Sequence, residues 1–159
     1  MTTYASFSLE QDYPQSIEEV YAAWTEAQLM AQWFWGSMGK NVEAHCDARP
    51  GGFWSVYTDY RGDPDWTRDR AGMLGFFVLV EPLQQLVYTI HWDANVVYNL
   101  GKTDCPDELI RVRFEPSDSG CRIHYTHEGF PEDGHAVKGH RDGTLDCLQQ
   151  LGKVLAAQT

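Results

Sequence analysis

The chain has 159 residues, and we expect a single domain over residues 1–159. With 43% hydrophobic and 13% aromatic residues, it can bury a substantial core. Its formal net charge of −11 argues against nucleic acid as a partner and against binding to anionic membrane surfaces, because both present negative phosphates.

The sequence shows no pattern typical of a membrane span, a signal peptide or closely spaced cysteines. There is no run of about 18 apolar residues, so we expect no membrane insertion. Residues 1–9 lack a basic patch followed by an apolar run, which predicts no signal peptide and a cytoplasmic location. The four cysteines lack close spacing, and we expect free thiols. They are Cys46, Cys105, Cys121 and Cys147.

The first predicted elements are a strand and a pair of short helices. Residues 3–13 alternate between apolar and polar side chains, which predicts a strand. Ser16 precedes Glu19 by the spacing of a capping box, which predicts the start of a helix. Apolar residues then follow at helical intervals to Trp24, and residues 26–34 predict a second short helix.

Several strands follow the helix pair. They are predicted over residues 41–46, 53–60, 72–80 and 85–92. Residues 50–52, with the sequence Pro-Gly-Gly, predict a turn, and residues 61–69 predict a polar loop. Residues 94–106 fit either a strand with a loop or a flap, and both alternatives stay open.

A hairpin and a long helix complete the predicted elements. Residues 107–116 and 121–128 predict two strands joined by a turn-forming segment. Residues 137–155 carry an apolar stripe with helical spacing. The stripe consists of Val137, Thr144, Leu148, Leu151 and Leu155. Because the only large partner for this helix is a sheet, we predict an α+β fold with helices on one face of an antiparallel sheet. A curved sheet would leave room for a small molecule under the helix.

Several segments, in their order along the chain, resemble one known family. They are residues 16–21 with Trp24 and Trp33, and residues 50–52, 75–82, 86–89, 126–130 and 139–140. Together they resemble the homologues of the Hsp90 ATPase activator, a family of the START-like superfamily, which is also called Bet v 1-like. The resemblance extends over nearly the whole chain.

This resemblance implies a helix-grip fold, in which a curved antiparallel β-sheet wraps around a long C-terminal helix and a short helix pair follows the first strand. It also implies a cavity for an apolar or amphipathic molecule, because the superfamily includes lipid carriers, hormone receptors, polyketide cyclases and aromatases. The chain departs from the family where the last helix begins, with Gly139-His140 in place of the usual Gly-Trp. The smaller titratable ring implies a wider or more polar pocket mouth.

Three polar side chains are candidates for contact with a ligand in such a cavity. On a helical wheel, Arg141 falls inside the apolar stripe and His140 on its shoulder. Arg141 either anchors a carboxylate or phenolate, or extends to solvent or to an acidic strand residue. His127 shares a strand face with Ile123 and Tyr125, which predicts an inward side chain. It is either a hydrogen-bonded structural histidine or a group that polarises a ligand.

Aromatic side chains give the main indication of ligand type. Flat apolar rings are typical walls of small-molecule sites, although most rings in a domain of this kind are expected in the core. His91 alternates with Trp92, so we expect His91 to face solvent if Trp92 faces the hollow. The predicted ligand contacts are Trp33, Trp54, Tyr57, Tyr88, Trp92, Tyr125, His127, His140, Arg141 and Thr144.

The sequence predicts no metal site, no cofactor and no catalytic residue. Adjacent His45 and Cys46 have no second ligand pair, and His135 and His140 are not spaced to stack on one helix face. No phosphate-binding loop or nucleophile elbow is present in the sequence.

Three functions stay open at this point. Binding of a small apolar or aromatic ligand ranks first, and a protein-interaction or co-chaperone-like module with a chaperone partner ranks second. An enzyme of the cyclase, aromatase or hydrolase kind ranks third. A homodimer through an exposed strand edge is a further alternative.

Overall fold

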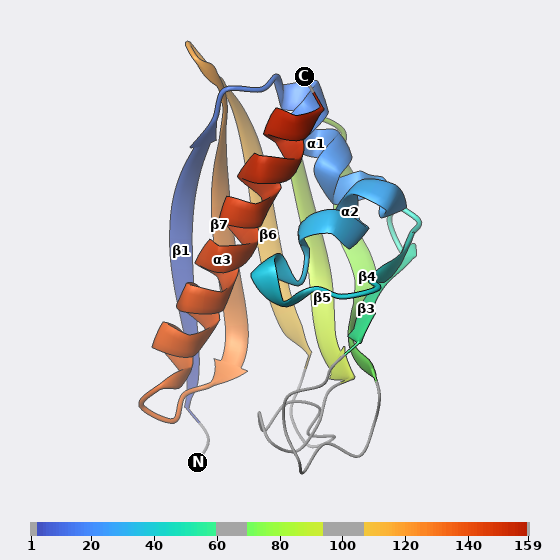
Figure 1. Ribbon diagram of the computed structural model, residues 1–159. Helices are drawn as coiled ribbons and strands as arrows, with labels where there is room; N and C mark the ends of the chain where they lie inside the picture. The colour runs from blue at the N-terminus through green and yellow to red at the C-terminus, as the bar shows by residue number, and fades with distance from the viewer. Residues whose placement is uncertain (1–2, 60–69, 94–106, 159) are drawn as a thin grey trace.

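A curved antiparallel sheet and a long C-terminal helix dominate the architecture (Figure 1). The protein's structure, a computed structural model, describes residues 3–59, 70–93 and 107–158. The predicted polar loop at residues 61–69 and the ambiguous segment at residues 94–106 lie outside these ranges. The predicted α+β helix-grip fold is confirmed.

In the described part of the chain, the strands form one sheet in the order β1-β7-β6-β5-β4-β3-β2, and every neighbouring pair is antiparallel. Their bounds are Tyr4–Tyr13 (β1), Glu43–Cys46 (β2), Phe53–Asp59 (β3), Arg70–Glu81 (β4), Gln85–Asp93 (β5), Glu108–Ser117 (β6) and Gly120–Pro131 (β7). Because β1 pairs with β7, the strand that leads into the last helix lies next to the edge strand of the sheet.

The helices cover one face of this sheet. Their bounds are Ile17–Thr25 (α1), Ala27–Trp33 (α2), Gly36–Met38 (η1, a 3-10 helix) and Ala136–Ala157 (α3). Figure 1 shows α3 lying across β1, β7 and β6, with α1 and α2 beside it on the same face of the sheet. Of these two helices, α1 contacts β6 and α2 contacts β2. Among the described residues, no helix is both long and apolar enough to span a membrane.

The start of α1 follows from its local sequence. The Oγ atom of Ser16 accepts a hydrogen bond from the backbone N–H of Glu19 at 3.2 Å, and the Glu19 carboxylate accepts one from the backbone N–H of Ser16 at 2.8 Å. These reciprocal bonds satisfy two amide groups that a helix N-terminus leaves without partners. The predicted capping box is therefore confirmed.

Aromatic rings fill the interior beneath α1 and α2. The Trp24 ring packs edge-on against Trp33 at a centroid distance of 4.6 Å. Phe34 and Trp54 are 5.7 Å apart, and Trp54 and Tyr88 are 5.3 Å apart, again in edge-on arrangements. Such edge-to-face contacts stabilise a core beyond the burial of apolar area alone. These rings belong to one hydrophobic core that continues beneath α3.

The two halves of α3 differ in burial. In the C-terminal half, Leu148, Leu151 and Leu155 are buried, each at most 1% exposed. In the N-terminal half, Val137 and Thr144 of the predicted stripe are only partly buried. Side chains at the start of α3 are therefore more exposed to solvent than those nearer its end.

The Tyr13 hydroxyl ties β1 to α3. It is buried and donates a hydrogen bond to the backbone carbonyl of Leu148 at 2.8 Å. We expect Tyr13→Phe to lower the free energy of unfolding by about 1–2 kcal/mol, because the carbonyl loses its side-chain donor. Urea denaturation followed by circular dichroism measures this change. Tyr4→Phe, on the same strand but 47% exposed, is the control and should change stability by less than about 0.5 kcal/mol.

Candidate functional site

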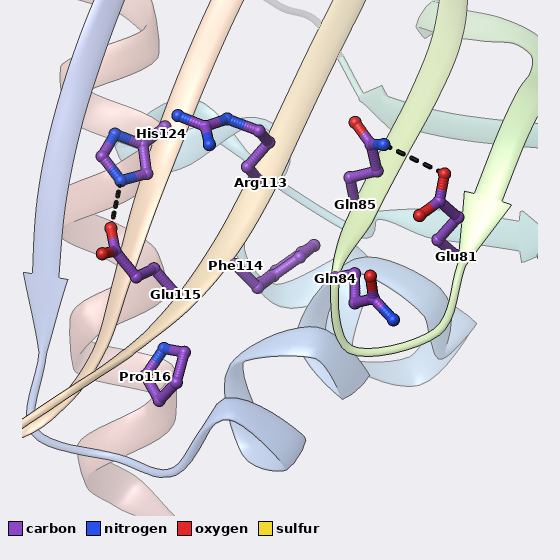
Figure 2. Close-up of a pocket in the computed structure, with 8 residues that line it drawn as sticks. All are labelled: Glu81, Gln84, Gln85, Arg113, Phe114, Glu115, Pro116 and His124. Carbon is purple, nitrogen blue, oxygen red and sulfur yellow. Dashed lines mark hydrogen bonds and ion pairs between the residues drawn. The ribbon is translucent and has the colours of Figure 1, made fainter.

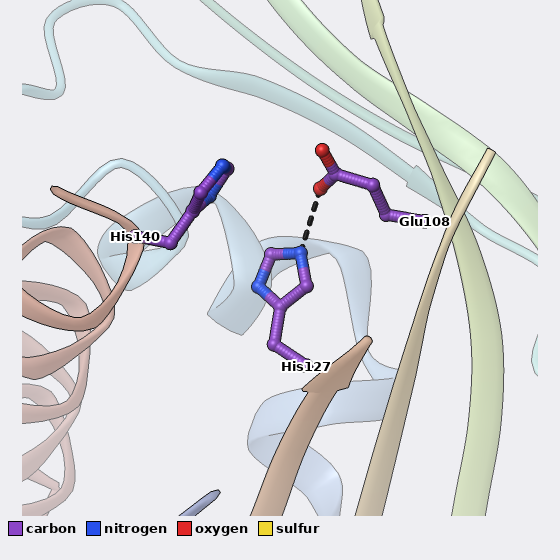
Figure 3. Close-up of side chains that lie close together, drawn as sticks. All are labelled: Glu108, His127 and His140. Carbon is purple, nitrogen blue, oxygen red and sulfur yellow. Dashed lines mark hydrogen bonds and ion pairs between the residues drawn. The ribbon is translucent and has the colours of Figure 1, made fainter. Parts of the chain in front are cut away.

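Three ionisable side chains from β6, β7 and α3 meet inside the fold (Figure 3). Glu108, His127 and His140 each offer one ligand atom, and these atoms lie within 4.8 Å of one another. Glu108 is 6% exposed and His127 is 2% exposed, while His140 is partly buried. Charged and titratable groups are rarely buried unless they are paired, so this cluster is the main candidate for a functional site.

Strand alternation explains why Glu108 and His127 face inward. Glu108 begins a series of alternate β6 residues that are all buried, followed by Ile110, Val112 and Phe114. Ile110 pairs with His127 in the register of β6 and β7. Glu108 therefore lies diagonally beside His127 on the same face of the sheet, at a distance that long side chains can span.

A β-bulge adds a further ring to the wall around this cluster. The pairing of β1 with β7 shifts between Ala5 and Ser6, and Gly129 on β7 has a φ of 89°. Glycine adopts this left-handed conformation readily because it has no Cβ. The extra residue lets both His127 and Phe130 point inward, although they are three positions apart.

Glu108 is held by two hydrogen bonds to one of its oxygens. Nε2 of His127 lies 2.6 Å from Oε2 of Glu108, and Nε1–H of Trp92 donates to the same oxygen at 2.9 Å. Burial by itself raises the pKa of Glu108, but its hydrogen bonds with His127 and Trp92 and its favourable electrostatic interaction with the neighbouring imidazoles outweigh this effect, and the pKa lies below its usual value. Glu108 is therefore a carboxylate in the interior.

The second ring nitrogen of His127 has no such partner. Nδ1 is buried and makes no hydrogen bond within the described residues. The rings of Phe7, Phe130 and His140 surround it, with centroids 5.5, 5.3 and 5.0 Å from that of His127. When Nε2–H donates to Glu108, Nδ1 presents a lone pair to this interior. It can accept a proton or a hydrogen bond, or bind a metal ion.

His140 closes the cluster from the helix. Its ring centroid lies 4.3 Å from that of Phe130 and 6.2 Å from that of Trp92. Burial lowers the pKa of His140, and the opposing attraction of the Glu108 carboxylate is weaker. At neutral pH the His140 side chain is therefore a neutral imidazole with one nitrogen available as an acceptor.

Two further predicted contacts lie next to the cluster. The Tyr125 ring centroid is 6.5 Å from that of His127, and the Thr144 side chain of α3 lies close to Tyr125. Burial, reinforced by the nearby Tyr88 hydroxyl, raises the pKa of Tyr125 well above its usual value. Tyr125 is therefore a neutral phenol that links the inner face of β7 to α3.

Three other predicted contacts belong to the core. Nε1–H of Trp33 donates to the Ala23 carbonyl at 2.9 Å, and Nε1–H of Trp54 donates to the Thr89 carbonyl at 3.1 Å. The Tyr88 hydroxyl accepts a hydrogen bond from the Trp24 indole at 3.3 Å. The polar atoms of these rings bind other parts of the chain, and the rings pack in the hydrophobic core.

Tyr57 lies elsewhere than expected, and Arg141 follows the second of its two alternatives by extending toward solvent. Tyr57 is on the outer face of β3, where its hydroxyl donates to Asp93 at 2.9 Å, because the alternate residues Trp54 and Val56 occupy the inner face. Arg141 is exposed and donates to the Ser8 carbonyl at 3.2 Å. The wheel placed Arg141 inside the stripe, but its side chain reaches the edge strand β1 and lies away from the cluster.

Glu108 was not among the predicted site residues. A signal for it exists in the sequence, because a glutamate stands at the first position of an otherwise apolar alternating series in β6. His91 faces outward, as the alternation predicts, and Nδ1 of His91 lies 3.0 Å from Asp107. Spacing along the chain does not reveal this possible metal-ligand set, because Glu108, His127 and His140 lie on three separate elements.

A shallow recess of about 510 Å³ lies on the outer face of the sheet (Figure 2). It is lined by Glu81, Gln84, Gln85, Arg113, Phe114, Glu115, Pro116 and His124. Figure 2 shows His124 paired with Glu115, at 2.6 Å, and Gln85 paired with Glu81, at 3.0 Å. Its lining is mostly polar and partly self-paired, so the recess does not suit an apolar ligand.

Comparison with known proteins identifies related sequences and folds. The model of the family described as Activator of Hsp90 ATPase homolog 1-like protein matches residues 14–156. The comparison with curated proteins finds no match.

Solved structures share the fold over almost the whole chain. A protein from Rhizobium leguminosarum is 24% identical, with a TM-score of 0.77, and the match covers 99% of this chain and 97% of that one. A protein from Rhizobium loti is 26% identical, with a TM-score of 0.74 and coverage of 97% and 99%. A protein from Rhodobacter sphaeroides is 15% identical, with a TM-score of 0.76 and coverage of 99% of both chains.

Proposed function

Because this chain belongs to the family of activator of Hsp90 ATPase homolog 1-like proteins, we propose that it binds a small, neutral molecule with an apolar or aromatic body. The ligand lies between the N-terminal half of α3 and the sheet. Its polar group reaches the cluster of Glu108, His127 and His140. The START-like superfamily, which the sequence resembles, holds apolar or amphipathic molecules in the corresponding space.

The Nδ1 atom of His127, which is buried and has no hydrogen-bond partner among the described residues, carries this proposal. A buried polar atom without a hydrogen bond costs about 1–3 kcal/mol of stability. Such a cost is offset when a ligand supplies the missing partner. A hydroxyl group on the ligand suits Nδ1, because Nε2 is already engaged with Glu108.

The surroundings of the cluster define the rest of the ligand. The rings of Phe7, Phe130 and Trp92 offer flat apolar contacts on three sides of the histidines. The Glu108 carboxylate disfavours an anionic group beside it, because like charges repel strongly in a buried site. A neutral aromatic alcohol or phenol therefore fits better than an aromatic acid.

A matched pair of probes tests this proposal. We expect 2-naphthol to bind about three- to tenfold more tightly than naphthalene, which corresponds to one hydrogen bond to Nδ1. Quenching of tryptophan fluorescence measures both affinities, because Trp92 contacts the cluster. In His127→Phe the two affinities should become equal within about twofold, because the ring is kept and the acceptor is lost.

The control for this experiment is His91→Phe. His91 also pairs with an acidic residue, Asp107, but lies on the outer face of the sheet. This variant should keep the wild-type preference for 2-naphthol. Failure of every neutral aromatic probe to quench the fluorescence or raise the melting temperature would contradict the proposal.

One observation favours a second candidate function, acid–base catalysis. His127 lies within hydrogen-bond reach of Glu108, and a carboxylate that orients an imidazole leaves the other nitrogen ready to take a proton. Mass spectrometry of bound ligands after long incubation distinguishes the two functions. A ligand recovered unchanged supports a binding protein, whereas conversion that is lost in His127→Phe supports an enzyme.

A chaperone partner is the alternative that the family description brings. Affinity capture with an ATPase chaperone, using wild type and His127→Phe, tests this alternative. Equal capture by both variants, together with no binding of aromatic probes, would favour an interaction module over a ligand carrier.

A further inference from the structure

The cluster of Glu108, His127 and His140 also has the composition of a metal centre. Two imidazoles and one carboxylate are ligands that suit Zn²⁺, Fe²⁺ and Co²⁺. One ligand atom from each residue lies within 4.8 Å of the other two. The three residues come from β6, β7 and α3, so a bound ion would connect both the strands and the helix. We propose that these three side chains bind one divalent transition-metal ion.

The contact between His127 and Glu108 marks where an ion would bind, because Nε2 of His127 and Oε2 of Glu108 face each other 2.6 Å apart. In a purely structural pair, the bond from Nε2 to Glu108 would be enough, and Nδ1 would be expected to reach a backbone carbonyl or solvent. Instead Nδ1 is buried without a partner among the described residues. Figure 3 shows this nitrogen on the side of the ring that faces His140. Because Nδ1 points away from Glu108, the ion would bind Nε2 in place of the proton shared with Oε2, and His140 would supply the second imidazole.

The distances allow an ion after a small adjustment. Metal–ligand bonds of about 2.0–2.2 Å in a tetrahedral centre place the ligand atoms about 3.4 Å apart. The ligand atoms of the three residues lie up to 4.8 Å apart, so they must approach one another by about 1–1.5 Å. Rotation of the His140 side chain can provide this movement, because His140 lies in the N-terminal half of α3, which is only partly buried.

Neighbouring side chains already hold the proposed metal-binding residues in position. The Trp92 indole donates to Oε2 of Glu108 and orients the carboxylate, as outer-shell donors do at metal sites. Packing against Phe7 and Phe130 limits rotation of the His127 ring. Three protein ligands leave at least one coordination position for a water molecule or for an oxygen of a ligand. Coordination of an oxygen from an organic ligand depends on the proposed function. Binding of the ion itself does not, since the ion can bind without an organic ligand.

Metal binding to protein without a histidine tag, first treated with a chelator, tests the proposal. We expect one Co²⁺ per chain, with visible absorption bands that show coordination by nitrogen, and one Zn²⁺ by isothermal titration calorimetry. In His127→Phe and His140→Phe, the affinity for Zn²⁺ should fall at least tenfold, whereas the aromatic packing is kept. Unchanged affinity in either variant would overturn the proposal.

A surface site is the necessary control. His124 lies between Glu10 and Glu115, at 3.1 and 2.6 Å, and exposed groups of this kind bind metal ions weakly. His124→Gln should leave the stoichiometry and affinity of the tight site unchanged. If binding disappears in His124→Gln, the ion binds at the surface and the proposal is wrong.

A measurement on the wild-type protein covers the case in which a variant fails to fold. Paramagnetic Co²⁺ should broaden the backbone amide signals of Glu108, His127 and His140 first in NMR spectra. Broadening centred on His124 would overturn the proposal. Binding of 2-naphthol without any ion would leave the proposed function intact and refute only the metal site, and binding of the ion without 2-naphthol would do the reverse.

Discussion

Glu108→Ala is expected to lower the free energy of unfolding by about 3–5 kcal/mol. The substitution removes the carboxylate that lies 2.6 Å from His127 and leaves that buried imidazole without its partner. It also deprives the Trp92 indole of its acceptor. Breaking a buried pair from one side is costly because the remaining group keeps its desolvation penalty. Urea denaturation followed by circular dichroism measures the change.

Glu128→Ala is the matched control for this prediction. Glu128 lies one position from His127 on β7 and pairs with Arg111 at 3.4 Å, but both side chains are exposed. Its removal should cost less than about 1 kcal/mol, because solvent screens surface ion pairs. Equal losses in Glu108→Ala and Glu128→Ala would show that the buried pair has no special energetic role.

The double variant Glu108→Leu/His127→Leu separates stability from function. Replacing both members of a buried pair by apolar residues is often neutral or stabilising, so we expect most of the lost stability to return. The same variant should show no preference for 2-naphthol over naphthalene, because the acceptor for the hydroxyl is gone. A stable double variant that keeps this preference would contradict the assignment of His127 as the polar contact.

Trp24→Ala is expected to destabilise the protein by a similar amount, about 3–5 kcal/mol, for a different reason. Trp24 is 1% exposed, and its ring lies between Trp33 and Phe114, at 4.6 and 5.6 Å. Alanine leaves a large cavity beneath α1 and removes the donor to the Tyr88 hydroxyl. Thermal and urea denaturation should both show the loss.

Two further substitutions serve as comparisons for the stability loss in Trp24→Ala. Trp24→Phe keeps a ring and should lose less stability than Trp24→Ala, because the residual cavity is smaller. Met38→Ala, at a side chain that is 54% exposed, should change stability by less than about 0.5 kcal/mol. A loss in Trp24→Ala as small as that in Met38→Ala would mean that the aromatic core tolerates the cavity.

Most of the fold could be predicted from local patterns. The capping box at Ser16 and Glu19 fixes the start of α1, and the helical spacing predicts α3 to within two residues at each end. Alternation predicts the strands and the inward side of His127. These features depend on bonds and packing between residues that are close in the sequence, so the sequence alone contains them.

The site could be predicted only in part. His127, His140 and Trp92 were among the predicted contacts, whereas Glu108 was not, and the predicted contacts Tyr57 and Arg141 lie outside the cluster. Alternation divides the residues of a strand into two faces but does not say which face is concave. A helical wheel gives a stripe but not the position of the helix relative to the edge of the sheet.

Local sequence patterns specify the elements, the single long helix and the presence of titratable groups within apolar series. Strand pairing and helix packing select which of those groups meet. The register of β6 with β7 sets Glu108 beside His127, and the path of α3 brings His140 to them while Arg141 reaches β1. Distances of this kind depend on strand pairing and helix packing between residues far apart in the chain, which no local pattern encodes.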